Sequence, residues 1–201
     1  MLTTKQLKEI NDWRNSWSST GGRKLSIVGC GTEEEVISNA IDKAHAPSVL
    51  RALKTGDIST KAPRAEVKEL LINELSKALY ASMSQKEFDN WNAHLCEKIK
   101  GIYHKYKITD YTLGNAQKLL NMTIKYIFSS DIINPDLDFF KIAHIPIDRI
   151  IMKAATKKLG VAPLEKAWSA TDDMTELLDF QSKLRDSLSD EFPLLWEIKN
   201  W

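Results

Sequence analysis

The chain has 201 residues, of which 43% are apolar and 27% are charged, a composition that excludes a disordered tail and indicates a folded globular protein. No apolar run approaches the ~20 residues of a membrane-spanning helix, and the opening MLTTKQLKEI lacks the apolar core of a secretion signal, so we expect a cytoplasmic protein without membrane contact. The net charge of +1 excludes a uniformly basic chain but leaves room for a basic face.

Cysteine and histidine, the common ligands of transition metals, show no ligand spacing. The two cysteines, Cys30 and Cys96, form no CxxC motif, so the sequence excludes a thiolate zinc site and a disulfide framework. Of the four histidines, only His94 and His104 lie near one another, and their spacing is typical of independent groups. We therefore expect neither a metal nor another cofactor.

Helical periodicity dominates the first half of the chain. The first expected helix carries apolar residues at helical spacing: Leu7, Ile10, Trp13 and Trp17. Thr32 with Glu35 reads as a capping box that opens a second helix, and Ser84 with Glu87 as another. Between them, a long segment that begins after Pro63 carries one apolar stripe.

Helices also account for the second half, where we expect them over roughly 110–129, 146–159, 174–188 and 192–200. The segment LSIVGCGTEEE resembles a short strand and a glycine turn of a nucleotide-binding unit, but no partner strand follows. A bare GxG is a weak phosphate-binding signal, and a glycine turn between helices is the better interpretation. The sequence predicts an all-α fold in a single domain, residues 1–201.

The helix expected over 110–129 has an unusual polar face. Opposite its apolar residues it carries Gln117, Lys118, Asn121 and Lys125. A solvated surface is the common explanation of such a stripe, but an idle exposed face usually mixes glutamate with lysine. Two amides and two lysines without a glutamate favour a binding or catalytic surface.

Asp148 is the second feature of interest. It follows Pro146 in the otherwise apolar run HIPIDRII, where a helix is expected to begin. An aspartate there caps the helix and complements its dipole, and an asparagine would cap it nearly as well, so Asp148→Asn is expected to leave folding nearly intact. A carboxylate held in this way also has a fixed direction, which suits it to stabilise a developing cation or to orient a nucleophile.

The residues around these two features resemble a known family. The IPID element is similar to the catalytic-aspartate element of the helix-hairpin-helix DNA glycosylases, and QKLLNMTIKYI resembles the lysine-bearing helix of their archaeal 8-oxoguanine branch. The resemblance covers about 45 residues, from Tyr111 to Ala155. The chain departs from the family in lacking the closely spaced glycines of the hairpin; only Gly114 remains.

The resemblance implies a two-lobed helical fold with a central cleft. The N- and C-terminal helices would form one lobe and residues of about 84–160 the other. It also implies catalytic roles for Lys118 and Asp148. The carboxylate would stabilise oxocarbenium character on the deoxyribose or position water, and the lysine amine would attack the anomeric carbon if a Schiff base forms. The target base would be flipped out of the duplex.

Several further residues are candidates for contacts with DNA. Asn115, Gln117 and Asn121 are expected to read base edges, and Trp168 is either a stacking wall or part of the core. Residues 141–158 contain five cations against one acid, whereas residues 169–191 contain seven acids against two cations. We expect Arg149, Lys153 and Lys157 of the basic region to contact phosphates. Lys125, from the helix expected over 110–129, is expected to make a further phosphate contact.

The expected function is therefore a DNA glycosylase acting as a monomer on duplex DNA with a modified base. Within the family the chain is most similar to bacterial anti-phage enzymes that remove α-glucosyl-hydroxymethylcytosine from viral DNA. Repair of 8-oxoguanine is the nearest alternative. A non-catalytic helical module that binds DNA or protein is an alternative of another class, and the position of Lys118 relative to Asp148 discriminates between the two classes.

Overall fold

The structure is a computed structural model that describes residues 1–19, 29–45, 59–189 and 191–200. These ranges contain helices and no β-strand, which confirms the predicted all-α fold. The α-helices are α1 (Thr4–Ser19), α2 (Glu33–Ala44), α4 (Lys61–Ala78), α5 (Gln85–Lys105), α6 (Leu113–Phe128), α7 (Asp138–Ile142), α8 (Arg149–Leu159), α9 (Met174–Asp186) and α10 (Pro193–Asn200). A short 3-10 helix, η1, spans Trp168–Ala170. None of these helices combines the length and the apolar character needed to cross a membrane.

Local sequence signals explain where several helices begin. The capping box of Ser84 and Glu87 at α5 is confirmed in both of its hydrogen bonds. At α2 only half of the predicted box forms. The Thr32 hydroxyl accepts from the Glu35 N–H, but the Glu35 carboxylate accepts from the N–H of Gly31 instead of Thr32. The proposed strand, residues 25–28, lies outside the described residues. Gly29 and Gly31 of its glycine turn are described and lie in a non-helical segment just before α2.

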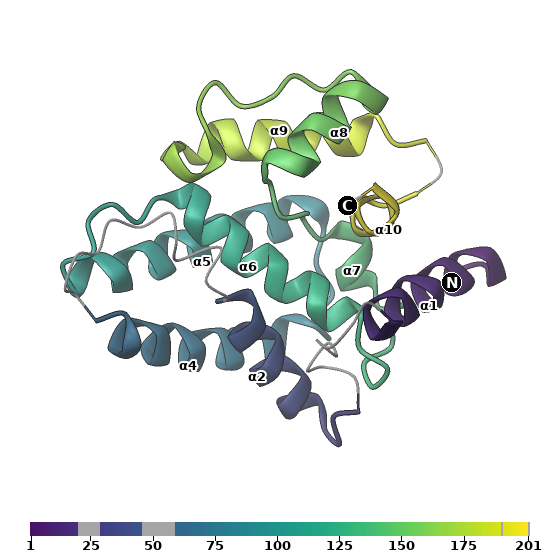
Figure 1. Cartoon of the computed structure of the whole chain (residues 1–201), viewed down its shortest axis with the longest axis horizontal. Helices are drawn as coiled ribbons and strands as arrows, with labels where there is room; N and C mark the ends of the chain where they lie inside the picture. The colour runs from purple at the N-terminus through teal and green to yellow at the C-terminus, as the bar shows by residue number, and fades with distance from the viewer. Residues whose placement is uncertain (20–28, 46–58, 190, 201) are drawn as a thin grey trace.

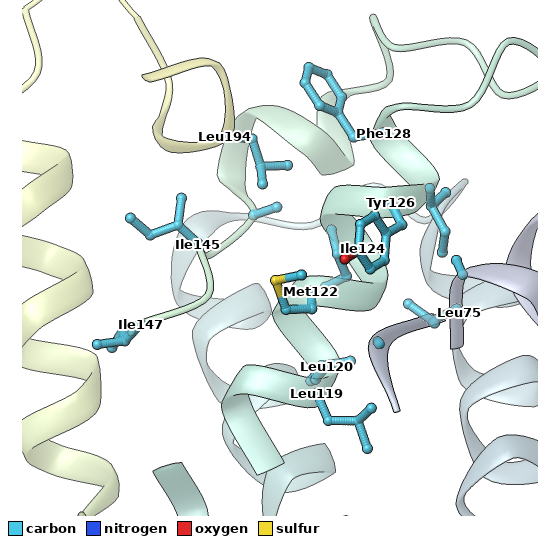
Figure 2. Close-up of a cluster of buried hydrophobic side chains, with 14 of the residues drawn as sticks. Leu75, Leu119, Leu120, Met122, Ile124, Tyr126, Phe128, Ile145, Ile147 and Leu194 are labelled. Atoms are coloured by element: carbon cyan, nitrogen blue, oxygen red, sulfur yellow. The ribbon is translucent and has the colours of Figure 1, made fainter. Parts of the chain in front are cut away.

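Helix α6 is the centre of the fold. It packs against α2, α5 and η1, and every one of its residues is buried. A helix that is buried on all sides belongs in the core, whereas a surface helix has one solvent-exposed polar face. Figure 2 shows Leu119 and Leu120 of α6 among the buried apolar side chains that fill this core. The same cluster includes Ile145 and Ile147, from the segment that joins α7 to α8.

The remaining helices are arranged around α6 (Figure 1). Helices α8 and α9 lie on one side of α6, and α4 and α2 on the other. The two ends of the chain meet, because α1 packs against α10, and α10 also contacts α7 and α8. The first two helices pack in different places, because α1 contacts α10 whereas α2 packs against α6 and α4.

Candidate functional site

A buried non-helical segment, residues 143–148, joins α7 to α8 and passes alongside α6. No strand of the described ranges pairs with its backbone, and two glutamine side chains provide the hydrogen bonds instead. Gln117 donates to the Ile147 carbonyl at 3.0 Å and accepts from the Ile147 N–H at 3.1 Å. Gln181 bonds Ile145 in the same two-point manner, at 2.7 and 3.2 Å. Because buried peptide groups must be paired, these amides fix the path of the chain into Asp148.

The amides predicted to read base edges therefore have another role. The exposed fractions of Asn115, Gln117 and Asn121 are 1%, 2% and 1%. Asn121 donates to the Ile145 carbonyl at 3.2 Å and accepts from Asn92 at 2.9 Å. We correct the base-reading assignment of all three, since side chains this deeply buried do not reach a base in the structure as it stands.

Asp148 is the N-cap of α8, and its two carboxylate oxygens have separate tasks. Oδ1 accepts from the N–H groups of Ile150 and Ile151, each at 2.9 Å. This is the capping role that the sequence predicts, although α8 begins at Arg149 and Pro146 lies before the helix in the buried segment. Since capping occupies Oδ1 alone, Oδ2 remains free to act on another group.

That other group is Lys118. Its Nζ lies 2.5 Å from Asp148 Oδ2, and each side chain is 11% exposed. The structure thus brings together the lysine and the aspartate that the sequence singled out, across 30 residues of chain. The pair lies just beneath the surface, where a charge is only weakly screened but the side chains are not sealed from solvent.

Trp168 completes the surroundings of Lys118. The Lys118 Nζ lies 5.1 Å from the centroid of the Trp168 ring, within the range of a cation–π contact, and Trp168 is partly exposed. Gly114 makes this placement possible. Its N–H donates to the Thr171 carbonyl at 2.9 Å, and a Cβ at Gly114 would lie 1.6 Å from the carbonyl oxygen of Trp168. Only glycine lets the backbone of η1 approach α6 so closely.

Lys125 was predicted to contact phosphate, and the structure corrects this. Its side chain has an exposed fraction of 0% and its Nζ lies 2.5 Å from Oε1 of Glu197, which is equally buried. Burial lowers the pKa of Lys125, and the same burial raises the pKa of Glu197. Lys125 is therefore part of a buried ion pair that connects α6 to α10, and it is not a contact for DNA.

Arg149, Lys153 and Lys157 are all exposed on α8. They recur at four-residue spacing on the helix that Asp148 caps, which gives that helix a basic stripe. Within the described part of the chain no carboxylate lies within 4 Å of these three cations. The stripe is thus available to bind an anion near the Lys118–Asp148 pair.

Three residues important for this arrangement were missed by sequence reasoning: Asn92, Gln181 and Glu197. Each is a polar side chain inside an otherwise apolar helical stripe, next to Trp91, Phe180 and Trp196 respectively. That position is the signal that was available, because a polar residue on a core face is buried and must find a partner. The partners themselves come from other helices and are not visible in the sequence.

Comparisons of the chain with protein-family models, with curated proteins and with solved structures gave no match. The chemistry of the site itself is therefore the basis on which a function can be inferred.

Proposed function

We propose that the chain is a DNA glycosylase that excises a modified base. The observation that carries this proposal is the contact between Lys118 Nζ and Asp148 Oδ2 at 2.5 Å. A helix cap needs no lysine partner, as the cap of α9 illustrates. There Asp173 accepts from the N–H groups of Thr175 and Glu176 and forms no ion pair with any described residue.

The chemistry follows from these two groups. When the bond between C1′ and the base nitrogen breaks, its electron pair leaves with the base and positive charge develops on the sugar. Asp148, held by two backbone N–H groups, stabilises that charge without reorganising and directs a water molecule to C1′. The water oxygen bonds C1′, the water gives up a proton to solvent and the departing base takes one up from solvent, which leaves an abasic site and the neutral free base. The flipped base would stack on Trp168.

The ion pair favours hydrolysis by water over attack by the lysine. An ammonium group paired with a carboxylate has no lone pair to offer, so Lys118 must first lose a proton before it can form a Schiff base. In the proposed mechanism Lys118 instead positions the substrate and the carboxylate. The exposed stripe of Arg149, Lys153 and Lys157 would hold the phosphates beside them.

The proposed substrate is α-glucosyl-hydroxymethylcytosine in viral DNA, which would make the protein an anti-phage enzyme of the cytoplasm, with 8-oxoguanine as the alternative base. The test is incubation of the protein with phage DNA carrying the glucosylated base, with 8-oxoguanine DNA and with plain DNA, scored for abasic sites. Release from the glucosylated DNA alone supports the proposal. Failure to form abasic sites in any of the three DNAs contradicts it.

The exposed basic stripe also fits a non-catalytic module that binds DNA, because phosphate contacts require no reaction. The same experiment separates the two functions. A module would bind all three DNAs with similar affinity and release no base, whereas a glycosylase turns over its substrate.

Replacement of Lys118 by glutamine tests the choice between hydrolysis and lysine attack. If Lys118 is the nucleophile, borohydride reduction traps a covalent complex between the parent protein and DNA, and the Lys118→Gln variant forms none. We expect no trapped complex with the parent, although it makes abasic sites. A trapped complex would contradict the hydrolytic mechanism and assign the Schiff base to Lys118.

Replacement of Lys153 and Lys157 by alanine tests the basic stripe. The double variant should bind all DNA sequences more weakly and reduce the slope of log K against log salt concentration by roughly one for each phosphate that is no longer neutralised. The control replaces Lys77 and Lys86, two exposed lysines at the end of α4 and the start of α5, which removes the same charge elsewhere. Equal slopes for the two double variants would show that the stripe makes no specific contact.

A further inference from the structure

A depression of about 380 Å³ lies where α2 ends and α4 begins. The residues that line it include Lys61, Arg64 and Lys68, which follow one another at helical spacing on α4. Among the described residues that line the depression, Asp42 is the only acid, and it already pairs with Lys68 at 2.5 Å. The described residues of its lining, three cations and one carboxylate, thus carry an excess of two positive charges.

The start of α4 adds a further attraction for an anion. Thr60 is the N-cap of this 18-residue helix, but its side chain makes no capping hydrogen bond. The N–H of Lys61 finds only the Ser59 hydroxyl, at 3.3 Å. The positive end of the α4 dipole and the weakly bonded N–H of Lys61 therefore lie at the same depression, which Thr60 and Lys61 line.

His45 provides an independent sign of a binding site. It lines the depression, is only 2% exposed and is the C-cap of α2. Its Nδ1 lies 3.1 Å from the carbonyl oxygen of Ile41, an acceptor, so Nδ1 carries the proton. Its Nε2 is buried and has no hydrogen-bond partner among the described residues. A buried polar atom without a partner is costly, and a bound group that accepts a hydrogen bond from protonated Nε2 removes that cost.

We propose that this depression is a binding site for a phosphate group, held by Arg64, Lys61, the N-terminus of α4 and His45. The site is separate from the Lys118–Asp148 pair and does not depend on the proposed function. A phosphate from a nucleic-acid backbone and free phosphate present the same oxygens to these donors. Their shared chemistry defines the site, and the experiment distinguishes the two sources.

Phosphate binding at this site is coupled to protonation of His45. Burial, followed by the charge of Arg64, lowers the pKa of His45 to about 4, while Asp42 opposes and Lys68 reinforces this effect. Helix α6 also packs on α2, but its buried lysines pair with Asp148 and Glu197. The negative charge of an anion between Arg64 and His45 favours the protonated ring and so counteracts the lowering of the His45 pKa by burial and by Arg64. Binding of the anion is therefore accompanied by uptake of a proton. Affinity for the anion should therefore increase as the pH falls, by up to about tenfold per pH unit.

The experiment titrates the protein with sulfate, a tetrahedral dianion whose own charge does not change near neutral pH, at constant ionic strength. Binding is followed by the NMR signal of the His45 ring and by calorimetry. We expect saturable binding that Arg64→Gln weakens by about tenfold or more, as is typical for the loss of a charged hydrogen bond. Lys77→Gln, at the far end of the same helix, should bind sulfate as the parent does. Absence of saturable binding, or equal behaviour of the two variants, would overturn the proposal.

Two further measurements complete the test. His45→Gln should abolish the pH dependence of sulfate binding, whereas a dependence that survives would remove His45 from the site. A titration with plain duplex DNA then identifies the source of the phosphate. If Arg64→Gln weakens DNA binding and inorganic phosphate competes with DNA, the source is a backbone phosphate. If DNA binding is unchanged while sulfate binding is lost, the site takes free phosphate. Circular dichroism of each variant verifies that the fold is retained.

Discussion

Asp148→Asn should release base at a rate about 10²–10³ lower than the parent while still binding DNA. The substitution keeps an oxygen in the position of Oδ1, which accepts from Ile150 and Ile151, so α8 remains capped. It removes the negative charge that faces Lys118 and, in the proposed reaction, the developing cation. Preorganised electrostatic groups of this kind typically contribute ~3–4 kcal/mol to transition-state stabilisation. The measurement is single-turnover release of base together with a DNA-binding titration.

The structure changes one expectation for this variant. From the sequence alone, asparagine should leave folding nearly intact, because it caps a helix as well as aspartate does. The interaction between Oδ2 and Lys118 means that the variant also loses a charged hydrogen bond, at a cost of about 1.5–3 kcal/mol in the free energy of unfolding. Activity must therefore be measured at a temperature where the folded fraction of the variant has been verified.

Asp173→Asn is the matched control. Asp173 caps α9 through two backbone N–H groups, as Asp148 caps α8, but it is exposed and forms no ion pair with a described residue. Capping alone predicts that the two variants behave alike. Catalysis predicts that Asp173→Asn releases base at the parental rate and that Asp148→Asn does not. An Asp148→Asn protein with full activity would contradict the glycosylase proposal.

The sequence was sufficient to predict most helices, since periodicity and caps act within one or two turns. Ser84 and Glu87 illustrate this, because both hydrogen bonds of their capping box lie within four residues. Short helices are harder to predict. The five-residue α7 was missed because so short a segment has no period to detect.

The polar residues of α6 could not be placed from local sequence alone. Their spacing predicted a solvent-exposed face opposite an apolar one, but the whole helix is buried. The partners that make this burial possible lie 30 residues away for Gln117 and 72 for Lys125. A polar stripe with distant partners has the same pattern as a polar stripe facing solvent. Lys118 was singled out through a resemblance to a family, and its catalytic role stays a prediction. Lys125, on the same stripe, is fully buried in an ion pair with Glu197.

Lys125→Met should destabilise the fold by about 3–5 kcal/mol, the usual cost of removing one member of a buried ion pair. Glu197 is fully buried beside it, and one of its oxygens, Oε2, has no hydrogen-bond partner in the part of the chain that the structure describes. Without the ammonium group, the remaining carboxylate loses the attraction that compensates for its burial. The measurement is denaturant unfolding followed by circular dichroism, with parent and variant compared at the same pH.

The pH dependence of this loss follows from the pKa of Glu197. Burial raises that pKa above its ordinary value even in the intact pair, and removal of Lys125 removes the strongest opposing influence. The folded variant therefore holds a proton that the unfolded chain releases. Its stability is greatest below the ordinary carboxyl pKa and is lost as the pH rises through the raised value. The gap between parent and variant should accordingly be wider at neutral pH than in mild acid.

The double variant Lys125→Met, Glu197→Leu decides whether the loss comes from the unpaired charge. With both charges gone, apolar side chains fill similar space and no buried ion remains, so the double variant should be more stable than Lys125→Met alone. If it is less stable, packing around α10 and not charge accounts for the effect. Base release by the folded double variant should stay near the parental rate, because in the proposed reaction Lys125 touches neither DNA nor the sugar. A loss of activity as large as that of Asp148→Asn would place the buried pair in the catalytic site.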